Sequence, residues 1–197
     1  MTLQDIIQDF KEKTGLSDSE IARRTGVTRS TASRWSKGEI RRVSGEVLER
    51  LSELVGYNIE PVLKGMDITI KIPVLGYVKA GYDLFAEENY IGEEEVSLSD
   101  RKLGDYYLKV SGDSMNGVGI TNGSLVLVRK CNMIENGQIG VVLIGDEVTV
   151  KKVIYKDKML ILEAANPDVE NRYFTSKEVK NIPVQIIGQV VSCKTYF

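Results

Sequence analysis

The spacing of apolar residues changes along this chain of 197 residues, and that change limits its fold more than any other feature. In the first 56 residues, apolar side chains recur three and four positions apart and glycines follow the runs, as at the ends of amphipathic helices. From residue 106 onward, short apolar or alternating runs are separated by glycine-rich and polar turns, which is typical of strands and hairpins. The chain is therefore predicted to begin with helices and to end in β-structure.

This division predicts an α+β protein of two domains, with an all-α bundle in front of a mostly-β domain. We assign the helical domain to 1–65, a linker to 66–72 and the β domain to 73–197. The linker region has no clear helical period and also fits an early strand. Dense hairpin signals favour a partly closed sheet in the second domain. Its expected strands are 106–110, 124–128, 140–144, 147–154, 159–163 and 184–191.

Two short helices are predicted from residue 17 to 38. Ser17 and Glu20 are expected to form a capping box at the start of the first helix, and Gly26 is its stop. Thr28 is the expected N-cap of the second helix, which continues for about two turns. Two short helices joined by a Thr-Gly-Val turn form the helix-turn-helix layout.

Basic side chains concentrate around the second of these helices, although the net charge of the whole chain is −2. A basic patch in an otherwise acidic chain is typical of a nucleic-acid-binding surface, because phosphates dominate the affinity. Charge alone leaves a solvated helix face open as the alternative, above all for Arg23 and Arg24. Between residues 23 and 42 the single acid is Glu39, against Arg23, Arg24, Arg29, Arg34, Lys37, Arg41 and Arg42.

The absence of histidine limits the chemistry that a serine in this chain can perform. Ser114 follows an apolar run and lies on a Ser-Gly-Asp-Ser turn, but a serine–histidine triad is excluded by composition. The alternating run 147–153 contains Lys151 and Lys152. A lysine buried in such a strand loses proton affinity, and as a free amine it can take the proton of a serine hydroxyl. Ser114 is thus the leading nucleophile, and Ser111 is the alternative.

Strand alternation narrows the choice of lysine without making it. Lys151 would share one face of the strand with Thr149 and Val153, whereas Lys152 would share the other face with two valines. Both lysines therefore remain open on this argument. With Lys151 as the base, Thr149 would lie where it can orient the amine.

Composition gives no support to a metal, cofactor or membrane role. Cys131 and Cys193 form no CxxC motif, so neither a zinc site nor a redox motif is expected, and both are predicted to be reduced. No apolar run approaches the roughly 18–20 residues that span a bilayer. The N-terminus lacks the layout of a signal peptide. We expect a cytoplasmic, nucleoid-associated protein that needs no metal and no cofactor.

The segment 20–38 resembles the helix-turn-helix of lambda- and 434-type phage repressors and related bacterial regulators. Small and apolar residues must fall at fixed offsets for the two helices of that motif to cross closely, which makes the resemblance specific. The residues that match its packing positions are Ala22, Gly26, Val27, Ala32 and Trp35. The resemblance implies that the second helix enters the major groove of double-stranded operator DNA.

The outward positions of that helix and its flanks are the expected DNA contacts. Arg29 and Arg34 are the leading readers of bases, because arginine bound to guanine is the commonest specific contact. The residues expected to face bases are Arg29, Ser30, Ser33 and Arg34, and those expected near the DNA backbone are Thr28, Lys37, Arg41 and Arg42. Asp18 departs from the family pattern, which often has a phosphate-contacting glutamine there, and its charge would repel DNA unless turned away.

Three motifs in the second domain resemble those of LexA and the self-cleaving phage repressors, in the same order and spacing. Val78–Gly81 resembles their Ala–Gly cleavage site, Val110–Met115 their nucleophile segment and Val148–Lys152 their lysine strand. Ala80 and Ser114 are 34 positions apart, and Ser114 and Lys151 are 37 apart. One motif alone would be weak, but three behind a helix-turn-helix are a strong signal.

The resemblance implies a serine–lysine peptidase domain of the S24 type that cuts its own chain between Ala80 and Gly81. It selects Lys151 rather than Lys152 as the base of Ser114, and it implies a homodimer made through this domain. We expect the backbone N–H groups of Ser114 and Met115 to stabilise the oxyanion. By the same resemblance, a RecA filament on single-stranded DNA stimulates cleavage during the DNA-damage response.

Two alternatives to self-cleavage remain open for the second domain. In the first, the chain is a repressor whose peptidase domain is vestigial and which an antirepressor protein relieves. A serine–lysine peptidase acting on other proteins is less favoured, because an Ala–Gly bond lies within the chain itself. Under either repressor hypothesis, we expect the protein to come from a phage or a mobile element.

Overall fold

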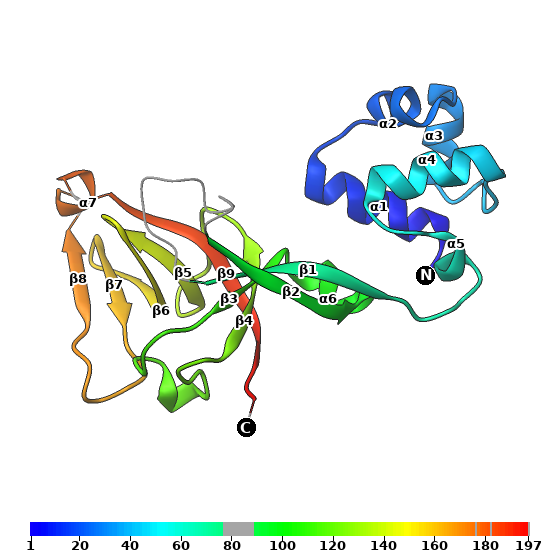
Figure 1. Ribbon diagram of the computed structural model, residues 1–197. Coiled ribbons are helices and arrows are strands. Elements are labelled where there is room, and N and C mark those ends of the chain that lie inside the picture. Colours follow the sequence, from blue (N-terminus) through cyan, green and yellow to red (C-terminus); the bar gives the residue numbers. More distant parts are fainter. Residues whose placement is uncertain (77–88, 176, 182, 197) are drawn as a thin grey trace. The chain divides into compact units, whose positions relative to one another are not determined.

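The computed structural model describes residues 1–76, 89–175, 177–181 and 183–196 (Figure 1). The chain divides into two compact units, Met1–Ile70 and Lys71–Phe197. The first unit is helical and the second is built on one sheet, so the prediction of a two-domain α+β chain is confirmed. Strand β1 covers Thr69–Leu75 and therefore begins within the range 66–72, where an early strand was the alternative to a linker.

The helical unit consists of α1 (Leu3–Thr14), α2 (Asp18–Thr25), α3 (Arg29–Ser36), α4 (Gly45–Val55) and α5 (Glu60–Leu63). The glycines that follow α1, α2 and α4 adopt the left-handed conformation that ends a helix. Helix α5 was not predicted, because a single turn is too short to show a helical period. No helix in the described ranges is long and apolar enough to cross a membrane.

Only half of the predicted capping box of α2 forms. The Ser17 side chain accepts a hydrogen bond from the Glu20 backbone N–H. The Glu20 carboxylate instead accepts hydrogen bonds from Arg23 and Arg24, which follow it by three and four positions on the same helix face. Charge-assisted bonds to the two arginines replace the bond back to the N-cap.

The core of the helical unit fixes the crossing of α2 and α3. Ile21 and Ala22 of α2 and Ala32 and Trp35 of α3 are all buried, with Trp35 only 2% exposed. Ala22, Ala32 and Trp35 are among the positions at which the sequence resembles a helix-turn-helix. Burying the small and large apolar residues together leaves the opposite face of α3 in contact with solvent.

The second unit is a single nine-stranded sheet in the order β2-β1-β3-β4-β9-β5-β6-β7-β8. β1 pairs with β3 in parallel. All neighbouring strands from β3 to β8 in that order pair antiparallel. The final strand of the chain, β9, lies in the middle of the sheet between β4 and β5 (Figure 1). The remaining elements are β2 (Tyr90–Ser97), α6 (Leu98–Leu103), β3 (Tyr106–Lys109), the 3-10 helix η2 (Asn116–Val118), β4 (Leu125–Lys130), β5 (Ile139–Ile144), β6 (Glu147–Lys156), β7 (Met159–Glu163), β8 (Arg172–Thr175), α7 (Glu178–Asn181) and β9 (Val184–Lys194).

All six predicted strands are present, with ends shifted by a few residues. The two edge strands, β2 and β8, were not predicted. β2 has a glycine and three consecutive acids and is mostly exposed, so it lacks an apolar alternation. β8 is four residues long, which is too short for a clear period.

Two apolar clusters hold the centre of this sheet. One contains Leu108 of β3, Met115 and Val150 of β6, and the other contains Val153 of β6. β6 is therefore buried on both of its faces around position 151. A lysine at that position is enclosed by packed side chains on either side of the strand.

Candidate functional site

Ser114 lies on the turn between β3 and η2, which several backbone contacts shape. Val110 N–H donates to the carbonyl of Ser124, and Gly112 N–H donates to Oδ1 of Asn122 at 3.0 Å. Gly112 has φ of +96°, a conformation that favours glycine. Met115, 2% exposed, anchors the end of the turn in the core. Ser114 is thus held at a fixed place beside β6.

Lys151 reaches Ser114 from the neighbouring strand. Its Nζ lies 2.5 Å from Oγ of Ser114, 3.2 Å from Oγ1 of Thr149 and 3.3 Å from the carbonyl oxygen of Val150. Lys151 is 6% exposed, one of the few buried charged or polar residues. The structure therefore brings Ser114, Lys151 and Thr149 together, in the arrangement expected from the sequence.

The surroundings of Lys151 favour the neutral amine. Burial lowers the pKa of Lys151 below its ordinary value, and the positive charge of Arg172 lowers that pKa further. Among the described residues, no carboxylate forms an ion pair with Lys151, whereas Lys152 pairs with Glu163 at 2.9 Å on the more exposed face. Lys151 can therefore give up its proton more readily than an exposed lysine.

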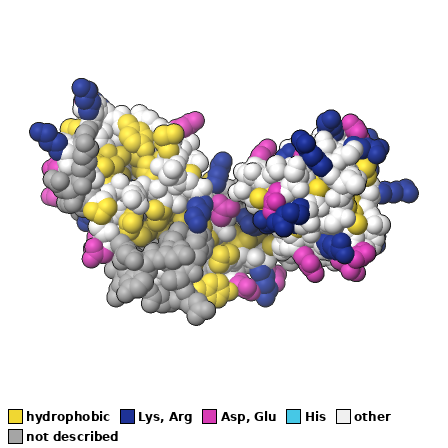
Figure 2. Space-filling view, turned by 90° about the horizontal axis from the view of Figure 1, so that it is seen from above, with side chains coloured by type: hydrophobic (Ala, Val, Ile, Leu, Met, Phe, Trp, Pro, Cys, Tyr) yellow, Lys and Arg dark blue, Asp and Glu magenta, His cyan; other side chains and the backbone are white. Residues whose placement is uncertain are grey.

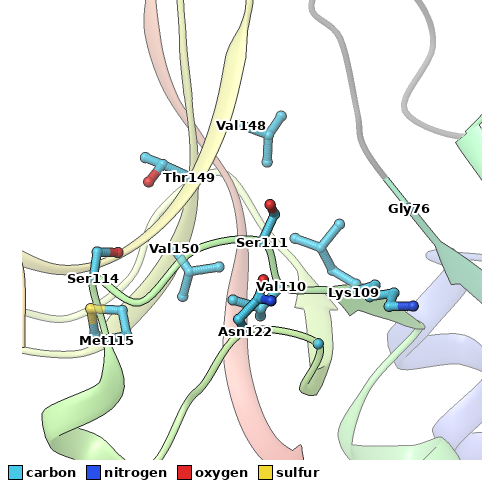
Figure 3. Close-up of a pocket in the computed structure, with 12 residues that line it drawn as sticks. Gly76, Lys109, Val110, Ser111, Ser114, Met115, Asn122, Val148, Thr149 and Val150 are labelled. Carbon is cyan, nitrogen blue, oxygen red and sulfur yellow. The ribbon is translucent and has the colours of Figure 1, made fainter.

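A cleft of about 510 Å³ opens beside Ser114 (Figure 3). Apolar side chains from β3 and β6 form much of its wall, and Ser114 and Thr149 contribute hydroxyl groups. Ser111 also lines this cleft, but in the described part of the chain the amine of Lys151 bonds to Ser114 and not to Ser111. The full lining is Gly76, Leu108, Lys109, Val110, Ser111, Ser114, Met115, Asn122, Gly123, Val148, Thr149 and Val150.

The predicted scissile residues, Ala80 and Gly81, lie outside the described residues. The two ends that flank them are described, and they meet: Gly76 N–H donates to the carbonyl of Asn89 at 2.8 Å. Gly76, the last described residue before the scissile pair, also lines the cleft that holds Ser114.

The outward face of α3 carries the residues expected to contact DNA. Thr28, Arg29, Ser30 and Arg34 are exposed, as are Lys37, Arg41 and Arg42, whereas Ser33 is half-buried. Thr28 Oγ1 accepts from Thr31 N–H at 3.2 Å, so this residue caps the helix as predicted. In the face shown in Figure 2, basic side chains over the helical unit are interspersed with acidic ones.

Neighbouring acids engage several of the basic side chains. Arg34 Nε lies 3.4 Å from Glu39, with both side chains about half exposed. Arg23 and Arg24 both bond to Glu20, and these bonds lower the pKa of Glu20 to about 2. Arg23 and Arg24 are therefore compensated within α2, whereas no ion pair is found for Arg29, Lys37, Arg41 or Arg42 with described residues.

Asp18, the departure from the helix-turn-helix pattern, is also compensated. Its Oδ1 accepts hydrogen bonds from Nζ of Lys11 and Oγ of Ser36, each at 2.7 Å. The bond from Lys11 is the largest cause of the lowered pKa of Asp18. Asp18 thus ties α2 to α1 and α3, and its charge is not left free to repel phosphate.

Comparison with known proteins accounts for both units. A family model described as Peptidase S24-like matches residues 73–191, and a model described as Helix-turn-helix matches residues 7–62. Over 206 residues the chain is 34% identical to the LexA repressor of Marinomonas sp. (strain MWYL1), covering 94% of this chain and 93% of that protein. The chain belongs to the LexA repressor family. It is also 32% identical over 169 residues to the LexA repressor of Erwinia tasmaniensis, with 84% and 81% of the two chains covered.

Membership of the LexA family accounts for the presence of a DNA-binding helix-turn-helix and an S24-like domain in one chain. The comparisons support a DNA-binding repressor of the LexA type, with a helix-turn-helix and an S24-like domain. Three residues near Ser114 and Lys151 went unnoticed in the sequence: Ala165, Asn166 and Arg172. They follow β7 or open β8, and no motif or period marks them, so only their contacts in the fold reveal them.

Proposed function

We propose that this LexA-type repressor inactivates itself by cutting the peptide bond between Ala80 and Gly81. Ser114 is the nucleophile and Lys151 the general base. The observation that carries the proposal is the 2.5 Å contact between Nζ of the buried Lys151 and Oγ of Ser114, a serine that lines an open cleft. A buried amine beside a serine hydroxyl is an arrangement that activates the serine.

The chemistry proceeds in two steps. The neutral amine of Lys151 takes the proton of Ser114 Oγ, and this oxygen attacks the carbonyl carbon of Ala80. Backbone N–H groups of Ser114 and Met115 stabilise the oxyanion. The lysine ammonium then gives its proton to the departing nitrogen of Gly81, which leaves an ester between Ala80 and Ser114. Water hydrolyses this ester and regenerates the serine.

The position of the bond along the chain supports cleavage within one molecule. Ala80 follows Gly76 by four positions, and four residues span at most about 14 Å. Gly76 lines the cleft of Ser114. The small side chains at positions 80 and 81 suit a segment that must enter its own active site.

Repression and its release follow from the separation of the two units. The helical unit binds double-stranded operator DNA through Arg29, Arg34 and their neighbours, and the S24-like domain joins two chains into a homodimer. A RecA filament raises the cleavage rate by favouring the conformation in which the bond is docked. Cleavage then detaches the DNA-binding unit from the domain that pairs it with a second copy.

Incubation of the full-length protein at alkaline pH tests this proposal. Because a higher pH deprotonates Lys151, the chain is expected to split into fragments 1–80 and 81–197, with a rate that rises with pH. Mass spectrometry of the products identifies the bond. Ser114→Ala and Lys151→Ala should each abolish the reaction, whereas Ser111→Ala should leave it unchanged.

Three outcomes would count against the proposal. An intact chain after alkaline incubation, with and without an activated RecA filament, would favour a repressor relieved by an antirepressor protein. Cleavage at another bond would remove Ala80 and Gly81 from the mechanism. Cleavage of a Ser114→Ala chain when mixed with the parent protein would indicate a peptidase that also acts between molecules.

A further inference from the structure

A two-residue segment after β7 holds the turn that carries Ser114. Ala165 N–H donates to the carbonyl oxygen of Ser114 at 2.8 Å, and the Ala165 carbonyl accepts from Gly117 N–H at 2.9 Å. Nδ2 of Asn166 donates to the carbonyl oxygen of Asp113 at 3.2 Å. The segment Ala165–Asn166 thus binds two consecutive carbonyl oxygens of the turn, those of Asp113 and Ser114.

The side-chain amide of Asn166 has a defined orientation. Asn166 is 6% exposed, and its Oδ1 accepts from Asp168 N–H at 3.0 Å. One of its partners is a backbone N–H, which only donates, and the other is a carbonyl, which only accepts. The oxygen and the nitrogen of the amide therefore cannot exchange places, and the donor must face Asp113.

Peptide geometry transmits this hold to the other side of the turn. In a trans peptide the C=O and the following N–H point in opposite directions, and the described part of the chain contains no cis peptide. The carbonyl of Asp113 shares a plane with the N–H of Ser114, and the carbonyl of Ser114 shares one with the N–H of Met115. Holding the two carbonyls on the Ala165–Asn166 segment therefore directs both N–H groups away from it.

These two N–H groups are available to a substrate. Neither donates a hydrogen bond to another residue in the described part of the chain. Ser114 and Met115 both line the cleft in which the nucleophile lies. They are the same two donors that the cleavage mechanism needs for its oxyanion.

We infer that Asn166 is a positioning residue for cleavage, whose amide holds the Asp113 carbonyl so that the Ser114 N–H group aims at the developing oxyanion, while the neighbouring Ala165 N–H holds the Ser114 carbonyl and so directs the N–H of Met115. The inference rests on the proposed self-cleavage and adds the origin of its oxyanion site. Asn166 itself does not contact the substrate. It acts on the backbone that carries the nucleophile.

Gly117 supports the role of the segment as a close-fitting partner of the turn. A Cβ at position 117 would lie 2.1 Å from the carbonyl oxygen of Ala165, a distance that carbon and oxygen do not tolerate. Only glycine lets the turn and the segment approach closely enough to bond. The glycine at position 117 thus allows the turn that carries Ser114 to pack against the Ala165–Asn166 segment.

The test compares Asn166→Asp with Asn171→Asp in the full-length protein. Asp at 166 keeps the oxygen that accepts from Asp168 N–H and loses the donor to Asp113. Asn171 lies in the same connection, and its Oδ1 accepts from Ala164 N–H at 2.9 Å, so Asp at 171 keeps its bond and adds the same charge. The readouts are the rate of self-cleavage across alkaline pH and the backbone amide resonances of Ser114 and Met115 in NMR spectra.

Loss of an oxyanion donor lowers an enzyme rate by about 100- to 1,000-fold, so misdirected donors should lower the plateau rate by about 10- to 100-fold. Asn166→Asp is expected to lower this rate and to shift the amide resonance of Ser114 more than that of Met115, whose peptide Ala165 still holds, while Asn171→Asp keeps the parent rate. An unchanged rate in Asn166→Asp, an equal loss in Asn171→Asp, or a shift along the pH axis with an unchanged plateau would each overturn the inference. A parent chain that does not cleave would instead refute the proposed function, and the amide resonances alone would then decide: unmoved resonances overturn the positioning role.

Discussion

Among individual residues, Lys151 is buried and forms no ion pair with any residue in the described ranges. It is 6% exposed, and its amine bonds to two hydroxyls and one carbonyl, all neutral acceptors. Burial and then the charge of Arg172 hold its pKa below the ordinary value of 10.5. In the pH range between the lowered pKa and 10.5, the unfolded chain binds a proton that the folded chain does not. The free energy of unfolding therefore rises with pH in that range.

We predict that this dependence disappears when Lys151 is replaced by methionine. In a Ser114→Ala background, which prevents cleavage, the free energy of unfolding of the lysine-containing chain should rise relative to that of Lys151→Met as pH rises from 7 toward 10.5. Urea unfolding at a series of pH values measures this difference. Lys152→Met is the matched control, since it removes the adjacent lysine of the same strand, whose side chain is about half exposed. A difference for Lys151 that stays constant with pH would contradict the prediction.

The choice between Lys151 and Lys152 illustrates the limit of single-residue reasoning. Alternation assigns the two lysines to opposite faces, but either face of an isolated strand is equally able to be the inner one. The pairing of β6 with β5 and β7, and the packing of the Ser114 turn, decide which lysine meets the serine. Thr149 was correctly expected beside the amine, because residues two positions apart share a face.

At the scale of the element, α3 is a short helix with a side-chain N-cap, and its basic side chains face solvent. Its N-cap, Thr28, and its buried Ala32 and Trp35 were predictable, because caps and packing offsets are local properties of the sequence. The pairing of Arg34 with Glu39 was not predicted. This pair is exposed, and surface ion pairs contribute only about 0–1 kcal/mol to the free energy of unfolding. Breaking the contact with Glu39 so that Arg34 could contact DNA would therefore cost little.

We predict that Arg34→Ala changes base preference rather than general affinity. Replacing an arginine that binds a guanine should cost about 1–3 kcal/mol at one operator position and relax the preference there. Binding titrations against a set of operators with single substitutions measure the effect. Arg24→Ala is the control, because it removes the same charge from a side chain that Glu20 holds. Equal losses on all sequences would mean that Arg34 contacts phosphate instead.

Other elements were harder to predict for physical reasons that differ between them. The edge strands β2 and β8 pair with β1 and β7, and each buries a single apolar residue, Val96 and Phe174, so neither shows an apolar alternation in the sequence. The capping box of α2 was half wrong because two arginines compete for the Glu20 carboxylate. A neighbouring strand decides the first case, and two arginines of the same helix decide the second.

At the scale of the whole molecule, two compact units share one chain, and the bond proposed to be cleaved follows strand β1 within the sequence of the second unit. A dimer that binds two half-sites gains affinity because the second unit binds at a high effective concentration. Cleavage would remove this gain without altering either the DNA-binding face or its contacts.

We predict that fragment 1–80 binds a two-half-site operator about 100- to 10,000-fold more weakly than the uncleavable Ser114→Ala chain. Fluorescence anisotropy titrations at one salt concentration measure both affinities, because phosphate contacts make them salt-dependent. A DNA with a single half-site is the control, on which the two proteins should bind with similar affinity. Equal affinities for the full operator would show that dimerisation does not supply the advantage.

The sequence by itself determined the division into a helical and a β unit and the helix-turn-helix packing positions, and it made Ser114 the leading candidate nucleophile. These features depend on residue spacing and on composition, including the absence of histidine. Strand alternation left Lys151 and Lys152 open and the family resemblance selected Lys151; the tertiary structure shows that its amine meets Ser114, and it alone shows that the Ala165–Asn166 segment holds the Ser114 turn. Both contacts join residues 37 or more positions apart, and a contact at that range depends on strand pairing and core packing, which no local pattern encodes.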